Sequence, residues 1–240
     1  MIEQATGALA PRAPRSRPAG RELEALLDEL AVADAALEGA DPAAALSWVF
    51  ERFGHGVVVT SSFQDCVLAD LAASVRPGVR VVFLDTGFHF PETLAYLRRV
   101  ERVLPIDVEV VSAGLPDDEH PCGTASCCEL RKVGPLQRCL VGAAAWVTGL
   151  KRCDAPTRAA ARTVAWDDAK GVVKVNPIVA WSEDDVAAYV DARGLPRHPL
   201  NALGYTSIGC APTTAPPLVG GDLRSGRWVG SSRTECGLHG

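Results

Sequence analysis

The 240-residue sequence predicts an α/β protein with a mostly parallel sheet and helices on both of its faces. Short β-branched apolar runs, typical of buried strands, alternate with longer segments whose apolar residues recur at helical spacing. Successive strands joined through a helix pack in parallel by right-handed crossovers, and such sheets bind ligands at the carboxyl ends of the strands. We therefore expect the functional site at those ends.

Composition limits the classes of protein that this chain can be. With 48% hydrophobic residues it can bury one substantial core, which predicts a single folded domain. A net charge of −5 argues against general nucleic-acid binding. No apolar run approaches the roughly 20 residues of a membrane span, and residues 1–20 lack the apolar core of a secretion signal. We expect a cytoplasmic protein without a membrane partner, whose eight cysteines serve as thiols, metal ligands or catalytic groups.

Two helices are expected before the first strand. Residues 1–20 are rich in Ala, Pro, Arg and Gly without apolar periodicity, and we expect them to be disordered. A helix is predicted from Arg21 to Leu37, where one helical face carries Leu23, Leu26, Leu27 and Leu30. A second helix begins at Asp41 and Pro42, which provide its N-cap and its first-turn residue.

The stretch from Val57 to Leu71 predicts a strand, a tight polar loop and a helix. Ser61 and Ser62 lie in the loop, and the helix start offers unpaired backbone N–H groups and a positive dipole end to an anion. This predicts a phosphate or sulfate site. The stretch matches neither a Walker loop nor GxGxxG, so a merely structural strand-turn-helix is the alternative.

Further strands are expected at 80–84, 106–111, 145–150 and 172–175. Pro91 opens the helix between the first two of these strands, and Ser182 caps an acidic helix start after the last. Asp85 and His89 follow the first of them and form a polar pair that suits chemistry. The alternative is that Asp85 caps a turn while His89 lies on the surface.

Two other features of the sequence point to chemistry. Cys127 and Cys128 are adjacent, and because neighbouring side chains point in different directions, packing alone hardly explains the pair. The pattern favours metal ligation. Beyond Gly194 the sequence is irregular, and residues 210–240 contain little that could build a core. This segment is expected to be a mobile functional tail, and its polar side chains include Arg224, Arg227, Cys236 and His239.

The motifs SSFQD, LDTGFHFPET, CCELRKVGPL, TGLKR, NPIVAW, GYTSIGC, RSGRW and ECGLH follow one another from about Val57 to Gly240. Together they resemble the assimilatory adenylyl-sulfate and phosphoadenylyl-sulfate reductases. The resemblance implies an adenine-nucleotide hydrolase-like (PP-loop) fold related to the ATP pyrophosphatases. It implies a reaction of sulfate assimilation and cysteine biosynthesis, in which activated sulfate and reduced thioredoxin give sulfite, an adenosine phosphate and oxidised thioredoxin. It divides the chain into a disordered segment 1–20, a nucleotide-binding reductase domain 21–209 and a catalytic tail 210–240.

The resemblance also implies a role for individual residues. Cys236 matches the nucleophile, and a thiolate suits attack on the electrophilic sulfur of a phosphosulfate anhydride, which leaves an S-sulfocysteine. His239 either acidifies this thiol or only shapes the tail. The matched binding positions are Lys132, Arg224 and Arg227 for the phosphosulfate, Ser61, Ser62, Gln64 and Asp65 for the nucleotide loop, and Lys151, Arg152 and Arg158 for a basic loop over the site. For the last three, a solvated surface charge is the alternative.

Family members that act on adenylyl sulfate resemble one another in a [4Fe–4S] cluster held by CC and a later CxxC. Here the later motif reads CAPT, so Cys127, Cys128 and Cys210 fill three ligand positions. The fourth is Thr213, and a hydroxyl is a poor iron ligand compared with a thiolate. A cluster would then hold water or an outside thiol at one iron, be labile, or use Cys122 as a substitute.

The sequence leaves alternatives open for the substrate and for the class of protein. Members acting on the 3′-phosphorylated nucleotide generally lack the cluster cysteines, which favours adenylyl sulfate here and leaves phosphoadenylyl sulfate as the alternative. More remote alternatives are a nucleotide-activating enzyme of the same fold, such as an ATP sulfurylase subunit or a tRNA-thiolating ligase, and a non-catalytic iron–sulfur redox sensor. Sulfite release without ATP distinguishes the reductase from both.

Overall fold

The computed structural model describes residues 13–116, 118–229, 233, 235 and 237–238. In this part of the chain six strands form one sheet in the order β3-β2-β1-β4-β6-β5. The strands are β1 Val57–Thr60, β2 Val79–Asp85, β3 Ile106–Ser112, β4 Ala145–Val147, β5 Val164–Asp167 and β6 Val172–Val175. Neighbouring strands are parallel except for the antiparallel pair β5 and β6. The prediction of a mostly parallel sheet is confirmed.

The direction of the crossovers reverses in the middle of this sheet. From β1 the chain builds outward through β2 to β3, and it then returns to place β4 on the opposite side of β1. In open parallel sheets such a reversal leaves a crevice outside the carboxyl ends of the two central strands. The loops after β1 and β4 therefore border a natural binding position.

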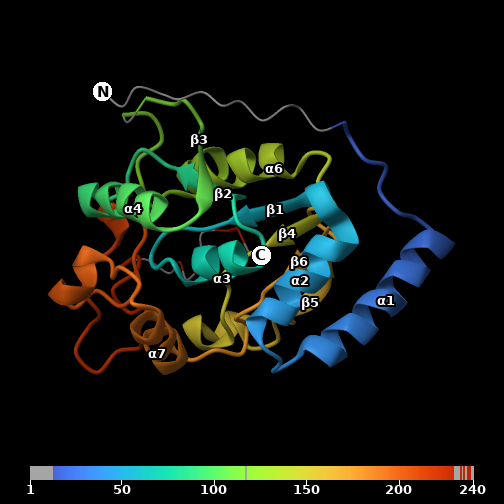
Figure 1. Ribbon diagram of the computed structural model, residues 1–240. Coiled ribbons are helices and arrows are strands. Elements are labelled where there is room, and N and C mark those ends of the chain that lie inside the picture. Colours follow the sequence, from blue (N-terminus) through green and yellow to red (C-terminus); the bar gives the residue numbers. More distant parts are fainter. Residues whose placement is uncertain (1–12, 117, 230–232, 234, 236, 239–240) are drawn as a thin grey trace.

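Helices cover both faces of the sheet, because successive strand residues point to opposite sides (Figure 1). Val59, Val81 and Val147 belong to the larger core, with side chains from α1 Arg21–Leu37, α2 Pro42–Phe53, α3 Val67–Val75, α4 Pro91–Val103 and α7 Glu183–Arg193. Their sequence neighbours Val58 and Val82 belong to the smaller core on the other face, where α6 Gly134–Leu140 packs. The predicted two-sided arrangement is thus confirmed.

Local sequence signals account for the helix starts. The Asp41 side chain accepts a hydrogen bond from Ala43 N at 2.8 Å, directly before the Pro that begins α2. Ser182 and Asp185 form a reciprocal capping box at the start of α7. On α1 the predicted apolar face is only partly buried, since Leu30 is in the core whereas Leu27 is 44% exposed.

The sheet differs from the sequence prediction at two places. Strand β4 ends at Val147 rather than at residue 150, and just beyond it Thr148 Oγ1 accepts a hydrogen bond from Leu150 N at 3.2 Å. Strand β5 was not predicted, since its four residues VAWD are too short to show a periodicity. The signal that could have revealed it is the turn before β6, where Gly171 adopts a φ of +66°.

The C-terminal segment packs on the carboxyl ends of the strands as far as the structure describes it. Single turns of 3₁₀ helix occur at Pro199–Leu203 and Ala211–Thr213. Contrary to the expectation of a segment without core residues, Cys210 is 5% exposed and Trp228 is 6% exposed. The proposed domain boundary at residue 209 stays a prediction. Among the described residues, no helix combines the length and the apolar character that crossing a membrane requires.

Candidate functional site

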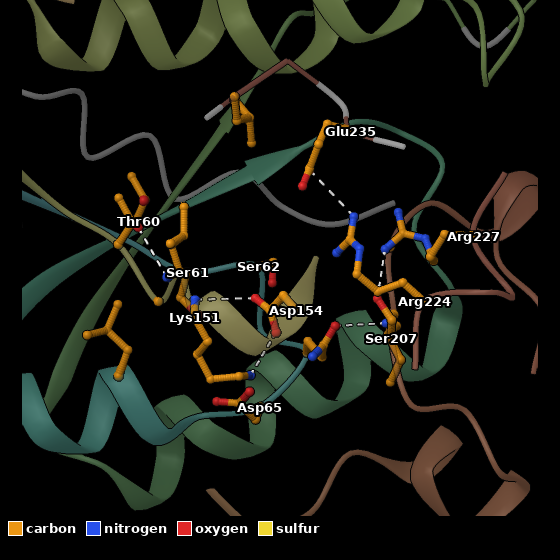
Figure 2. A pocket seen from close by; sticks show the side chains of 18 of the residues that line it. Thr60, Ser61, Ser62, Asp65, Lys151, Asp154, Ser207, Arg224, Arg227 and Glu235 are labelled. Carbon is orange, nitrogen blue, oxygen red and sulfur yellow. Dashed lines mark hydrogen bonds and ion pairs between the residues drawn. The ribbon is translucent and has the colours of Figure 1, made fainter. Parts of the chain in front are cut away.

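A cavity of about 200 Å³ lies outside the carboxyl ends of the central strands. Thr60 at the end of β1, Leu84 near the end of β2 and Thr148 directly after β4 line it. Figure 2 shows Ser61 and Lys151 on one side of the cavity and Arg224 and Arg227 on the other. The cavity thus occupies the position that the reversal of strand order predicts.

Most of the predicted binding residues meet at this cavity. Its lining includes Ser61, Ser62, Gln64, Asp65, Lys132, Lys151, Arg158, Arg224 and Arg227. Arg152 is the exception, and here the prediction needs correction. Its guanidinium donates to both carboxylate oxygens of Glu38, at 2.6 and 2.8 Å, and to Ala161 O at 2.7 Å. Arg152 does not line the cavity, because these bonds tie it to the end of α1.

The loop after β1 uses part of its polar groups to hold its own shape. Ser61 Oγ accepts from Phe63 N at 3.1 Å, and Phe63 is fully buried with a φ of +51°. Asp65 Oδ1 accepts from Val67 N at 3.0 Å at the start of α3, so it takes one of the N–H groups expected to face an anion. Gln64 Oε1 accepts from Ile208 N at 2.9 Å and joins the loop to the C-terminal segment.

A row of alternating charges crosses the cavity wall. Lys151 Nζ lies 3.2 Å from Asp154 Oδ1 and 2.9 Å from Glu183 Oε1. Arg158 bridges Asp154 at 2.7 Å and Glu235 at 2.8 Å, and Glu235 also lies 3.5 Å from Arg224 Nη2. These carboxylates balance most of the positive charge in the wall. The pairs made by Glu183 and Glu235 were not found in the sequence, because their partners are far away, up to 77 positions for Arg158 and Glu235.

Burial and neighbouring carboxylates act in opposite directions on Lys151, whose side chain is only 3% exposed. Burial alone lowers the pKa of its ammonium group, but Asp154, Asp65 and Glu183 outweigh this effect and raise the pKa above its ordinary value. Lys151 is therefore a fixed positive charge at neutral pH.

The RSGRW motif builds the opposite wall. Arg227 Nη1 donates to Ser207 Oγ at 3.3 Å, and its guanidinium lies 4.6 Å from the centre of the buried Trp228 ring. Gly226 packs so closely on Ala215 O that a Cβ there would collide with the backbone. Gly209 makes room for the Arg227 guanidinium in the same way. Gly226 and Trp228 of the motif, together with Gly209, thus fix the position of Arg227.

A second, smaller cavity adjoins the first and contains four cysteines. It is lined by Cys122, Cys127, Cys128, Cys210, Thr86, Gly123, Arg131, Lys132, Thr213, Arg227 and Trp228. Lys132, Arg227 and Trp228 also line the larger cavity, so these three residues form a shared wall. Cys210 Sγ lies 3.4 Å from Thr86 Oγ1, and the Cys210 backbone pairs with His89. The predicted set Cys127, Cys128 and Cys210 is therefore brought together.

The surroundings of Cys210 favour its thiolate. A hydrogen bond from Cys122 is the largest influence, and together with the charge of Lys132 it lowers the pKa of the Cys210 thiol to about 4 against the opposing effect of burial. Thiolates are the form in which cysteines bind iron or zinc. The donor set fits a thiolate-bound metal centre such as an iron–sulfur cluster.

Sequence reasoning missed Arg131, whose buried side chain lines the cysteine cavity. The adjacent cysteines end α5 Ala125–Cys128, and Arg131 lies in a π-helical segment, Glu129–Val133, that links α5 to α6. Its side chain is 2% exposed and donates to the carbonyl groups of Thr86, Leu115, Pro116 and Glu119. The only signal in the sequence for this role is that Arg131 lies within the motif CCELRK.

The polar pair after β2 has a mixed outcome. Asp85 Oδ1 accepts from Gly87 N at 2.9 Å, which confirms the interpretation as a turn cap. His89 is not a surface histidine, since Nε2 lies 3.1 Å from Leu84 O and the ring packs 4.6 Å from that of Phe83. Burial lowers the pKa of its imidazole. His89 also lines the larger cavity.

The predicted nucleophile Cys236 and its neighbour His239 lie outside the described residues. Two described residues near them in the sequence, Glu235 and Leu238, line the larger cavity. Leu238 also packs against the smaller core.

Comparison with known sequences gives a consistent result. Residues 56–216 match the model of the phosphoadenosine phosphosulfate reductase domain. An adenosine 5′-phosphosulfate reductase of Mycobacteroides abscessus is 50% identical over 214 residues, which cover 85% of this chain and 90% of that protein. The adenosine 5′-phosphosulfate reductase of Streptomyces coelicolor is 46% identical over 228 residues, which cover 91% of this chain and 95% of that protein.

Solved structures support the same fold. A phosphate complex of phosphoadenylyl-sulfate reductase from Candida auris has a TM-score of 0.67 at 24% identity, covering 78% of this chain and 97% of that one. FMN adenylyltransferase of Candida glabrata, with FAD and inorganic pyrophosphate, has a TM-score of 0.55 at 14% identity, covering 75% and 66%. The predicted adenine-nucleotide hydrolase-like fold is confirmed. By the extent of the domain match and the identity to its relatives, the chain belongs to the phosphoadenosine phosphosulfate reductase family.

Proposed function

We propose that this enzyme reduces adenylyl sulfate to sulfite and AMP with reduced thioredoxin, as a step of sulfate assimilation toward cysteine. The observation that carries the proposal is the larger cavity. It joins the loop after β1, the cations Lys132, Arg224 and Arg227, and the described neighbours of Cys236 in the sequence. An adenylyl sulfate anion needs these three elements together.

The first step is attack by the Cys236 thiolate on the sulfur of the phosphosulfate group. A sulfur–sulfur bond forms, and the bond between this sulfur and the bridging oxygen breaks, so AMP leaves with the electron pair. The product on the enzyme is an S-sulfocysteine. Lys132, Arg224 and Arg227 stabilise the charge that develops on the leaving phosphate, because they lie in a partly enclosed site.

The second step returns the enzyme to its starting state. A thioredoxin thiolate attacks Cys236 Sγ, sulfite leaves, and a mixed disulfide forms. The second thioredoxin thiol then attacks this disulfide and releases Cys236 as a thiolate, so thioredoxin loses two electrons and the sulfur of the substrate gains them. His239 either promotes formation of the Cys236 thiolate or shapes the tail.

Relatives named adenosine 5′-phosphosulfate reductase favour adenylyl sulfate over its 3′-phosphorylated form. The cluster of cysteines supports the same choice, because family members that use phosphoadenylyl sulfate generally lack it. Phosphoadenylyl sulfate is the alternative substrate. The proposal includes a cytoplasmic location and a tail, residues 210–240, that carries the nucleophile.

The cofactor of the proposal is a [4Fe–4S] cluster held by Cys127, Cys128 and Cys210. Their burial and common cavity support this, as does the lowered pKa of Cys210. When bound, such a cluster would add its electrostatic field to that of Lys132, which lines both cavities, and so help to place the substrate.

The test is a sulfite assay on anaerobically purified protein with thioredoxin and each of the two nucleotides. Cys236→Ser should abolish sulfite release and leave nucleotide binding nearly intact, because the thiol is needed for bond formation only. Mass spectrometry of the wild type mixed with substrate should show a sulfonate adduct on the Cys236 peptide. Cys153→Ser serves as the matched control, since Cys153 is exposed and does not line either cavity.

Each alternative has its own outcome in this assay. With ATP added to the same assay, ATP turnover without sulfite would support a nucleotide-activating enzyme of the same fold. A cluster spectrum without sulfite from either nucleotide would support a redox sensor. Sulfite release by Cys236→Ser at the wild-type rate would exclude Cys236 as the nucleophile.

A further inference from the structure

The fourth cysteine of the smaller cavity is Cys122, which the CC and CxxC pattern does not include. Cys122 lines the same cavity as Thr213 and the three cysteines of the pattern. It therefore lies beside the position where the pattern lacks a thiol. Cys122 and Thr213 come from segments 91 positions apart, so the structure brings them together rather than the sequence.

A glycine makes this close approach possible. Gly123 has a φ of +96°, and a Cβ added there would lie 3.0 Å from Thr213 Cγ2. The loop carrying Cys122 thus packs directly on the side chain of Thr213, and its positive φ at residue 123 favours glycine. Thr213 fills space with its methyl group while the neighbouring loop contributes the sulfur.

The same loop is held from both ends. Thr124 Oγ1 donates to Pro121 O at 2.9 Å and accepts from Cys127 N at 3.1 Å, which couples the loop to the helix that begins before the cysteine pair. Arg233 Nη1 donates to Gly123 O at 2.9 Å. The position of Cys122 is therefore fixed relative to Cys127 rather than left to a loose surface loop.

We propose that Cys122 is the fourth cysteine ligand of the iron–sulfur cluster, in place of a thiol at position 213. This inference rests on the cluster in the proposed function. Each of the four thiols releases its proton when its sulfur binds iron, so the chemistry of the site is that of four thiolates. Cys122, Cys127, Cys128 and Cys210 all line the same cavity, which is the donor set that the soft iron site prefers.

The experiment measures iron and acid-labile sulfide per chain, with visible absorbance, after anaerobic purification of the full chain. The wild type should hold about four irons. Cys122→Ser should hold about three or fewer, with a correspondingly weaker charge-transfer band and faster bleaching in air. Cys153→Ser, a change of the same kind at an exposed cysteine, should match the wild type.

Position 213 provides the decisive comparison. Thr213→Cys alone should not raise the iron content, because four thiolates are already present. The double variant Cys122→Ser with Thr213→Cys should regain the fourth iron, because it restores a thiolate to the same corner of the cavity. Circular dichroism and adenosine binding show whether each variant is folded, so loss of iron is separated from loss of structure.

Three results would overturn the inference. They are unchanged iron and absorbance in Cys122→Ser, a rise in iron on Thr213→Cys alone, and a wild type that binds no iron or sulfide. The first two leave the proposed function untouched, because that function is judged by sulfite release, whereas a wild type without iron or sulfide would also remove the cluster from it. Conversely, the wild type could hold iron but make no sulfite, while Cys122→Ser loses iron. This result would refute the proposed function and support Cys122 as a cluster ligand.

Discussion

Lys132, like Arg227, lines both the nucleotide cavity and the cysteine cavity. It also contributes to the lowered pKa of the Cys210 thiol. Its side chain thereby links the proposed substrate site to the proposed cluster. The sequence predicted Lys132 as a binding residue through its motif. Its place beside the cysteines could not be predicted, because it depends on the packing of segments far apart in the chain.

Replacement of Lys132 should weaken substrate use strongly. A charge-assisted hydrogen bond contributes ~1.5 to 3 kcal/mol, so Lys132→Ala should lower kcat/KM for adenylyl sulfate by roughly 10- to 150-fold. Lys132→Arg should retain more activity, and adenosine binding should change little. Arg152→Ala should stay within about twofold of the wild type, because Arg152 pairs with Glu38 outside the cavity. Equal losses for adenosine and adenylyl sulfate would instead indicate a damaged fold.

Elements with strong local signals were predicted well, and elements defined by partners far away were not. The strands β1, β2, β3 and β6 carry β-branched apolar runs, and Pro42, Pro91 and Ser182 mark helix starts. Strand β5 lacks such a run and exists because β6 pairs with it. The absence of Arg152 from the cavity lining has the same cause, since its partner Glu38 lies 114 positions away. A pairing of this kind leaves no pattern in a single sequence.

The contact between α4 and the turn Pro199–Leu203 should make stability depend on pH. His198 is buried there, with Nε2 3.0 Å from Thr93 Oγ1, and burial lowers its pKa to about 4. The unfolded chain has a histidine pKa of about 6.5. Between these values the unfolded state binds a proton that the folded state does not, so stability falls as pH decreases from about 6.5, by at most about 1.4 kcal/mol per pH unit.

Urea unfolding at several pH values between 7.5 and 4.5 checks this dependence. His198→Gln should be less stable at pH 7.5 but should lose less stability on acidification, because glutamine does not titrate. His55→Gln, at an exposed position, should keep the wild-type slope. If His198→Gln and the wild type showed the same slope, the buried histidine would not be the group responsible.

At the scale of the whole molecule, Glu235 connects the C-terminal segment to the basic loop. It pairs with Arg158 at 2.8 Å and with Arg224 at 3.5 Å, within the cavity proposed to receive an anion. A substrate anion bound in this cavity would therefore compete with Glu235 for the same cations. The sequence predicted Arg158 and Arg224 as binding residues but could not reveal the carboxylate between them, because Glu235 lies 77 positions from Arg158.

Removal of the Glu235 charge should separate binding from turnover. These pairs are mostly buried, so each contributes at least the ~1 kcal/mol that is the upper end for exposed pairs, and Glu235→Gln should lower KM for adenylyl sulfate by about fivefold or more. The maximal rate should fall, because the segment loses its anchor to Arg158. Asp191→Asn, which breaks the exposed pair with Arg197, is the control and should change neither value. A raised KM in Glu235→Gln would mean that the carboxylate supports substrate binding.

The order of the strands has a consequence for the way this protein is made. The crevice beside β1 needs β4 as its second border, and the cavity also uses residues as late as Leu238. When β1 to β3 have left the ribosome, the nucleotide loop after β1 is already synthesised, but the basic loop that faces it is not. A ligand stabilises only a state that contains its contacts. A ligand that uses the whole lining of the cavity can therefore stabilise the protein only after synthesis is nearly complete.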